Sequence, residues 1–251
     1  MPSVIQVRNL KVGEGLPKIC IPLTDPNTES LKKSLDMLMD SPCDLVEWRA
    51  DFYENFSDET VRSEALTVLR ETLGDTPLLF TIRTSREGGQ AEIETEEYES
   101  INRSVIETGL ADLVDVELSR GDDLIIDLAA FAHASGVKIV GSCHDFEKTP
   151  SKEEIVKTLC RMQELGADLV KYAVMPQCEQ DVLTLLDATL TMKTEHADTP
   201  VITMSMGQLG MISRLCGSLS GSAVTFGTAG RASAPGQLPA DLLKTILKNL
   251  T

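Results

Sequence analysis

Short runs of apolar and β-branched residues recur along the chain, separated by stretches with helical spacing. Eight such runs occur, at residues 18–23, 44–50, 78–84, 112–118, 138–144, 168–174, 201–206 and 223–226. Their centres lie about 20 to 35 residues apart, which leaves room for one helix in each interval. The pattern therefore predicts eight strands that alternate with helices.

The intervening segments carry helix signals of their own. Ser151 and Glu154 form a capping-box pattern, and Gly166 is expected to end the helix that follows. The buried face of this helix is predicted at Ile155, Leu159, Met162 and Leu165. Similar spacing predicts helices around Leu31, Leu35 and Leu38; around Ile125, Leu128 and Ala132; and around Leu242, Leu243, Ile246 and Leu247.

Eightfold alternation of strand and helix is typical of a closed barrel or of an open doubly wound sheet. An open nucleotide-binding sheet should carry a glycine-rich phosphate loop, and the chain contains neither GxGxxG nor GxxxxGK[ST]. We therefore predict an α/β fold, a (β/α)8 TIM barrel forming a single domain over residues 1–251. Residues 1–17 are predicted to add a short N-terminal β-hairpin that closes the barrel bottom.

Composition narrows the classes of partner and compartment. The chain has 251 residues and a formal net charge of −16, which argues against binding to nucleic acid or to anionic membranes. Its six cysteines are scattered without a CxxC pair, as expected for reduced thiols. No signal peptide and no apolar run long enough for a membrane span are visible, so we expect a cytoplasmic protein.

Polar residues interrupt the predicted strands with a period of two, although buried parallel strands are normally apolar. Side chains two residues apart point the same way, so these groups are predicted to project into one barrel mouth. For any single pair, a satisfied ion pair inside the barrel is the simpler interpretation, but charges on several consecutive strands favour a functional site. The residues are Glu47, Arg49, Thr81, Arg83, Asp115, Glu117, Ser142, His144 and Lys171.

Lys171 and His144 are the strongest candidates for chemistry. Lysine is rarely buried, and neighbouring arginines would favour its neutral amine, which can attack a carbonyl and form a Schiff base. His144 precedes a polar loop at the expected barrel mouth, where its imidazole suits proton transfer. Cys143 should face the helix layer, so we discount it as a nucleophile. A metal site is disfavoured, although a hard-cation site at Glu47, Asp115 and Glu117 stays open.

The sequence as a whole resembles the type I 3-dehydroquinate dehydratases, the Schiff-base enzymes of the shikimate pathway. The matching segments follow the family order from the second strand to the last loop. They are residues 46–51 (VEWRAD), 80–89 (FTIRTSREGG), 141–146 (GSCHDF), 167–173 (ADLVKYA), 203–207 (TMSMG) and 230–237 (GRASAPGQ).

The resemblance implies a role for each matching residue. Lys171 would be the Schiff-base lysine, His144 the proton-transfer residue and Glu87 the carboxylate that orients His144. The substrate would be bound by Glu47, Arg49, Arg83, Arg214, Ser233 and Gln237, and by an apolar wall of Met204, Met206 and Phe226. One departure is Pro22, where some family members have a serine contact.

The family further implies syn elimination of water from 3-dehydroquinate to give 3-dehydroshikimate, in chorismate and aromatic amino acid biosynthesis. It implies a homodimer with no metal or organic cofactor. The residues are also compatible with two other functions. One is a barrel aldolase that uses the same lysine for carbon–carbon cleavage, with Gly207 and Gly227 near a phosphate. The other is a ligand-binding sensor that has lost catalysis.

Overall fold

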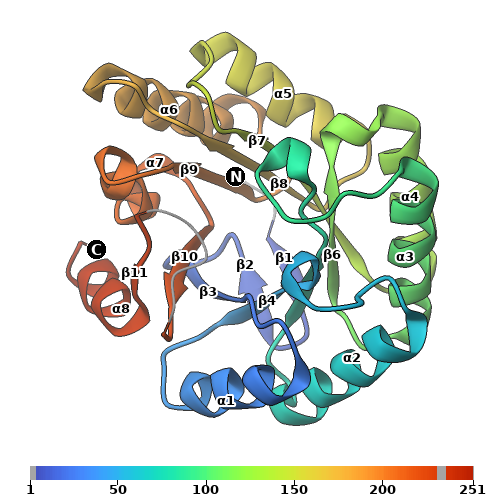
Figure 1. Ribbon diagram of the computed structural model, residues 1–251. Coiled ribbons are helices and arrows are strands. Elements are labelled where there is room, and N and C mark those ends of the chain that lie inside the picture. Colours follow the sequence, from blue (N-terminus) through green and yellow to red (C-terminus); the bar gives the residue numbers. More distant parts are fainter. Residues whose placement is uncertain (1–3, 231–235, 251) are drawn as a thin grey trace.

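Parallel strands follow one another around a barrel in the order of the sequence, with helices outside (Figure 1). The computed structural model describes residues 4–230 and 236–250. The main sheet has the order β11-β10-β3-β4-β5-β6-β7-β8-β9. Its strands are β3 (Lys18–Leu23), β4 (Leu45–Arg49), β5 (Leu78–Thr81), β6 (Leu113–Glu117), β7 (Lys138–Asp145), β8 (Leu169–Val174), β9 (Val201–Ser205), β10 (Val224–Thr228) and β11 (Leu238–Pro239).

The barrel closes between β9 and β10. Val201 and Ser222 form a parallel bridge, and the Ala223 N–H donates to the Val201 carbonyl at 2.7 Å. The predicted TIM-barrel architecture is confirmed. Each of the eight predicted strand regions overlaps an observed strand, with ends that differ by at most three residues.

Helices cover the outside of the barrel (Figure 1). The α-helices are α1 (Thr28–Met39), α2 (Glu59–Leu73), α3 (Thr95–Thr108), α4 (Asp122–Ala134), α5 (Lys152–Glu164), α6 (Glu179–Thr191), α7 (Gly217–Ser220) and α8 (Ala240–Asn249). Shorter helical segments are η1 (Ala50–Phe52), η2 (Ser85–Glu87), η3 (Leu118–Arg120), η4 (Met192–His196) and η5 (Leu209–Arg214). In the described part of the chain, no helix has the length and apolar character needed to cross a membrane.

The predicted helix signals are confirmed, except that Leu165 follows α5 as its C-cap and is only partly buried. Ser151 and Glu154 form both hydrogen bonds of the capping box, and Gly166 follows α5 with a left-handed φ of 96°. The predicted closing helix is α8, in which Leu243 and Leu247 form the face that packs on the barrel and Leu242 is 45% exposed.

The same tripeptide, Asp-Leu-Val, spans the start of three alternate strands, at residues 44–46, 112–114 and 168–170, with the aspartate directly before the strand. Each aspartate accepts a hydrogen bond from a backbone N–H near the start of the preceding strand. The three bonds are all 2.8 Å long and come from Ile19 to Asp44, Leu78 to Asp112, and Ile139 to Asp168. The repeated contact fixes the level at which β4, β6 and β8 start relative to their neighbours.

This shared start sets the level of the charged residues in the barrel. In each strand the leucine belongs to the apolar cluster inside the barrel, and the valine belongs to the cluster between sheet and helices. Because strand side chains alternate, the fourth residue again faces inward, one layer above the leucine. Those fourth residues are Glu47, Asp115 and Lys171.

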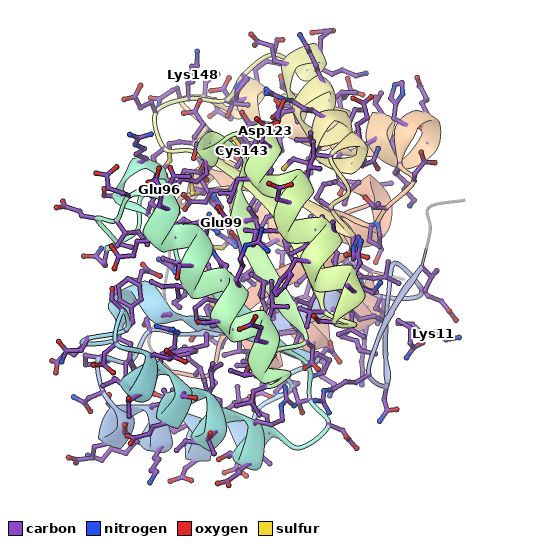
Figure 2. The ribbon with its side chains drawn as sticks, turned by 90° about the vertical axis from the view of Figure 1, so that its right-hand side faces the viewer. Lys11, Glu96, Glu99, Asp123, Cys143 and Lys148 are labelled. Atoms are coloured by element: carbon purple, nitrogen blue, oxygen red, sulfur yellow. The ribbon has the colours of Figure 1, made fainter. Side chains whose placement is uncertain are left out.

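An antiparallel hairpin, β1 (Ile5–Val7) and β2 (Leu10–Val12), precedes the barrel. Val7 and Val12 are buried in the same apolar cluster as Leu45 and Leu113 at the starts of barrel strands. Figure 2 shows Lys11 of the hairpin at the opposite end of the molecule from Lys148. The hairpin therefore lies at the amino-terminal end of the strands, away from their carboxyl ends.

Candidate active site

A single cavity brings together eleven of the twelve site residues predicted from the sequence. The cavity lies within the barrel toward the carboxyl ends of the strands. The eleven are Glu47, Arg49, Arg83, Glu87, His144, Lys171, Met204, Met206, Arg214, Phe226 and Gln237. Ser233, the twelfth, lies outside the described residues. Three further residues line the same cavity, Gly88, Phe146 and Ala173.

Lys171 carries its amine into this cavity from the middle of β8, with only 4% of the residue exposed. Its Nζ atom lies 3.3 Å from Oε1 of Glu47 and 4.0 Å from Oδ2 of Asp115. The amine also stands 4.5 Å from the ring centre of Phe226. We expected arginines as its neighbours, but these contacts are with carboxylates, because the repeated strand start places all three charged residues at one level.

The predicted pairing of His144 with Glu87 is present. Nδ1 of His144 lies 2.8 Å from Oε2 of Glu87, and the other oxygen of Glu87 accepts from the Ser119 hydroxyl at 2.6 Å. Burial and nearby cations, Arg83 first among them, hold the pKa of His144 well below its usual value. Burial raises the pKa of the Glu87 carboxyl to about 7. His144 is therefore neutral near pH 7, as a general base must be.

Arg83 joins the carboxylates of neighbouring strands. Its guanidinium donates to Asp115 at 2.8 Å, to Glu117 at 2.9 Å and to the Ser142 hydroxyl at 2.9 Å, and lies 3.5 Å from Glu87. Burying so many charges is tolerated only when each has an opposite partner. The carboxylates that we considered for a hard cation thus already contact cationic side chains.

The remaining predicted residues form the cavity walls. Arg49, at the end of β4, makes two hydrogen bonds to Asp51, of 2.7 and 2.8 Å, which fix its guanidinium plane. Arg214, from η5, is buried, and this desolvation lowers its pKa to about 10. A buried guanidinium in a cavity favours an anionic ligand. Met204 and Met206 form part of the apolar wall, and the sulfur of Met204 lies 3.8 Å from Arg214 Nη1.

Gly88 and Phe146 were missed by the sequence reasoning. Gly88 has a left-handed φ of 77°, and a Cβ at this position would come within 2.4 Å of the Phe146 ring. The ring therefore rests directly on the loop that carries Glu87. Phe146 lies one residue beyond the end of β7, so the period-two pattern of the strand does not extend to it.

Cys143 and Pro22 lie outside this cavity. Cys143 packs against the apolar cluster between sheet and helices, as predicted, and burial raises its thiol pKa to about 12. Figure 2 shows it on the helix side of the barrel wall. Pro22, in β3, lines a separate groove beside α1, so it offers no polar contact to the cavity.

Comparisons with known proteins agree with this geometry. The model of the family described as "Type I 3-dehydroquinase" matches residues 19–251. The chain belongs to the type I 3-dehydroquinase family. A 3-dehydroquinate dehydratase of Clostridioides difficile (strain 630) is 50% identical over 250 residues, covering 100% of this chain and 98% of that protein. One from Bacillus licheniformis is also 50% identical, covering 98% and 97%.

Solved structures give the same family. A type I 3-dehydroquinate dehydratase from Clostridium difficile, with covalently modified comenic acid, superimposes with a TM-score of 0.97 at 50% identity, covering 100% of this chain and 98% of that one. The Geobacillus kaustophilus 3-dehydroquinate dehydratase gives a TM-score of 0.95 at 40% identity, covering 99% and 96%. A 3-keto-L-gulonate-6-phosphate decarboxylase from Vibrio cholerae, at 14% identity and TM-score 0.63, shares the fold alone.

Proposed function

We propose that this chain is a hydro-lyase that dehydrates 3-dehydroquinate to 3-dehydroshikimate through a Schiff base on Lys171. The observation that carries the proposal is a buried lysine amine in the same cavity as a neutral, carboxylate-bound histidine. Membership of the type I family supports both the substrate and the reaction. The pathway is then the shikimate route to chorismate and the aromatic amino acids.

The chemistry begins with the neutral Lys171 amine, which attacks the ketone carbon and expels its oxygen as water. The resulting iminium draws electrons from the adjacent C–H bond. Nε2 of His144 removes that proton, and the electron pair forms an enamine. The β-hydroxyl then leaves as water with the proton that His144 returns, so one base on one face accounts for syn elimination. Hydrolysis of the conjugated iminium releases the product and the amine.

Glu47 and Asp115 fit the first step because each lies beside the Lys171 amine. In our proposal, Glu47 accepts hydrogen bonds from the amine and from the substrate hydroxyls. Arg214 binds the substrate carboxylate, and Arg49, Arg83, Ser233 and Gln237 complete the polar contacts. Met204, Met206 and Phe226 exclude water from the iminium.

The aldolase alternative expects a phosphate site near the end of β9 and β10. The cavity wall there carries the apolar side chains of Met204, Met206 and Phe226 beside Arg214, and the family that matches is a dehydratase family rather than an aldolase family. The sensor alternative expects the loss of Lys171 or His144, and both are present. No observation therefore favours a second function.

The test is borohydride trapping with 3-dehydroquinate, followed by intact mass and peptide mapping. We expect a reduced adduct on Lys171, absent from Lys171→Ala and retained in Lys148→Ala, which removes an exposed lysine near the mouth. Dehydration is followed in parallel by the absorbance of the conjugated product. A folded, inactive parent protein that forms no adduct would rule out the Schiff-base function.

We further propose that residues 1–251 form one domain, whose hairpin closes the barrel bottom, and that the protein is a cytoplasmic homodimer. The family resemblance and the absence of a membrane-spanning helix from the described residues are consistent with this. Light scattering coupled to size-exclusion chromatography measures the molar mass. A monomeric mass across micromolar concentrations would refute the dimer.

A further inference from the structure

Ser119 lies on the side of Glu87 that faces away from His144. Ser119 belongs to η3, directly after β6, and is exposed to solvent. Its hydroxyl donates to Oε1 of Glu87 at 2.6 Å, while Oε2 of Glu87 binds Nδ1 of His144 at 2.8 Å. Each carboxylate oxygen thus has a different partner, and the line Ser119–Glu87–His144 ends at the cavity.

We propose that Ser119 is a positioning residue that holds Glu87 ionised and in the orientation that His144 requires. The assignment rests on the proposed function, in which His144 is the base. It adds a residue outside the cavity lining to the residues that control proton transfer. Ser119 acts through Glu87 and has no contact with the reacting atoms in this scheme.

The surroundings of Glu87 explain why an extra hydrogen bond matters. Burial raises the pKa of its carboxyl, and Glu117 and Asp115 on β6 raise it further. Arg83, with Nη1 3.5 Å from Oε2, and the Ser119 hydroxyl oppose this effect. The thiol of Cys143, the amine of Lys171 and the guanidinium of Arg49 also face the pair. The carboxyl is therefore poised between its two protonation states, so one donor changes the balance.

The protonation state of Glu87 decides which nitrogen of His144 is the base. An ionised carboxylate only accepts, so Nδ1 carries the hydrogen and Nε2 keeps its lone pair for the substrate. A protonated carboxyl donates to Nδ1 instead, and the hydrogen of the neutral ring then occupies Nε2. In that form the ring cannot remove the substrate proton.

The test compares pH profiles of kcat for the parent, Ser119→Ala and Ser119→Thr. Losing the hydroxyl should raise the pKa of Glu87, so the acid limb of Ser119→Ala moves up by about one pH unit. We expect kcat to fall about tenfold at pH 6 and to stay within about twofold at pH 9, with KM little changed. Ser119→Thr, which keeps a hydroxyl, should restore the parent profile. Ser85→Ala, which removes another exposed serine from the η2 helix of Glu87, is the matched control.

A second readout does not depend on turnover. The chain has three histidines, so 15N-histidine labelling gives few resonances, and a His144→Gln variant identifies those of His144. In Ser119→Ala the change in hydrogen position on His144 should occur at higher pH than in the parent. Superimposable pH profiles and titrations, or an equal loss of kcat at every pH, would overturn the assignment. An inactive parent would instead refute the proposed function, and the resonances would still test Ser119.

Discussion

At the residue scale, Glu87 shows how a buried charge in the site lowers the free energy of unfolding. The residue is only 3% exposed and close to two other carboxylates, and its pKa rises from an ordinary value of 4.5 to about 7. The folded protein therefore binds a proton more tightly than the unfolded chain. By linkage, this group lowers the free energy of unfolding as pH increases from about 4.5 to 7, and the loss is complete above that range.

Glu87→Gln should separate stability from catalysis. The neutral amide can still accept from His144 Nδ1, yet it avoids the cost of burying a charge. We expect the free energy of unfolding to rise by roughly 1–3 kcal/mol at pH 8 and to change little at pH 4.5. Over the same comparison kcat should fall by about 10²-fold, because Glu87 no longer stabilises the imidazolium.

Urea unfolding at the two pH values measures the first effect, and initial rates measure the second. Glu92→Gln, at an exposed carboxylate nearby in sequence, is the control and should leave both unchanged. A Glu87→Gln variant that is less stable at pH 8 than the parent would contradict the view that burial of the charge, rather than its pairing with Arg83, dominates.

The repeated Asp-Leu-Val start of β4, β6 and β8 is the main feature at the element scale. Its aspartates do more than cap a single backbone N–H. Asp112 also accepts from Arg8 Nε at 2.6 Å and from Arg70 Nη2 at 2.7 Å, so it links the hairpin, α2 and the strand starts. These contacts lie at the end of the barrel opposite the site, which suggests a role in stability alone.

Asp112→Ala should therefore lower stability without lowering activity. The change leaves two guanidinium groups and the Leu78 N–H without their carboxylate, and we expect a loss of roughly 3–5 kcal/mol. Urea unfolding measures the loss, and kcat measured well below the transition should stay within about twofold of the parent. Asp75→Ala removes an exposed carboxylate 3.6 Å from Arg8 and should change neither quantity. A large fall in kcat with unchanged stability would show that the barrel ends are coupled.

The sequence predicted the strands well because the signal is local. An apolar run interrupted by inward polar residues identifies a barrel strand, and the inward parity of Glu47, His144 and Lys171 followed from period two alone. That these residues line one cavity follows once the strands close into a barrel.

The contact partners of each charged side chain could not be predicted in this way. Which charge contacts Lys171 depends on register between β4, β6 and β8, which no single strand encodes.

The contacts made by loops could not be predicted from the sequence for a similar reason. The hydrogen bond from Ser119 to Glu87 and the packing of Phe146 on Gly88 join segments that are 32 and 58 residues apart. Neither has a periodic pattern, because both residues lie in or beside turns after a strand. Resemblance to the family identified Glu87, but it gave no reason to select Ser119.

At the scale of the whole molecule, one end of the barrel carries the candidate active site and the other end carries contacts that stabilise the fold. The carboxyl ends of the strands carry buried charges that reduce stability, whereas the amino ends carry an apolar cluster completed by the hairpin. The net charge of −16 adds general self-repulsion to the folded state. A molecule of this kind needs its stabilising contacts away from the site, where they can be strong without restricting the chemistry.

The hairpin provides a direct test of this division. Val7 is 4% exposed inside the cluster at the bottom of the barrel, whereas Val4, three residues earlier, is 46% exposed. Val7→Ala should lower the free energy of unfolding by about 2 kcal/mol, because it removes two buried methyl groups and leaves a cavity, while Val4→Ala should leave it unchanged. Both variants should keep the parent kcat and KM at 25 °C, since the hairpin lies beyond the far end of the strands from Lys171. If Val7→Ala instead lowered kcat while unfolding at the parent urea concentration, the hairpin would be adjusting the position of the charged layer, and the two ends would act as one unit.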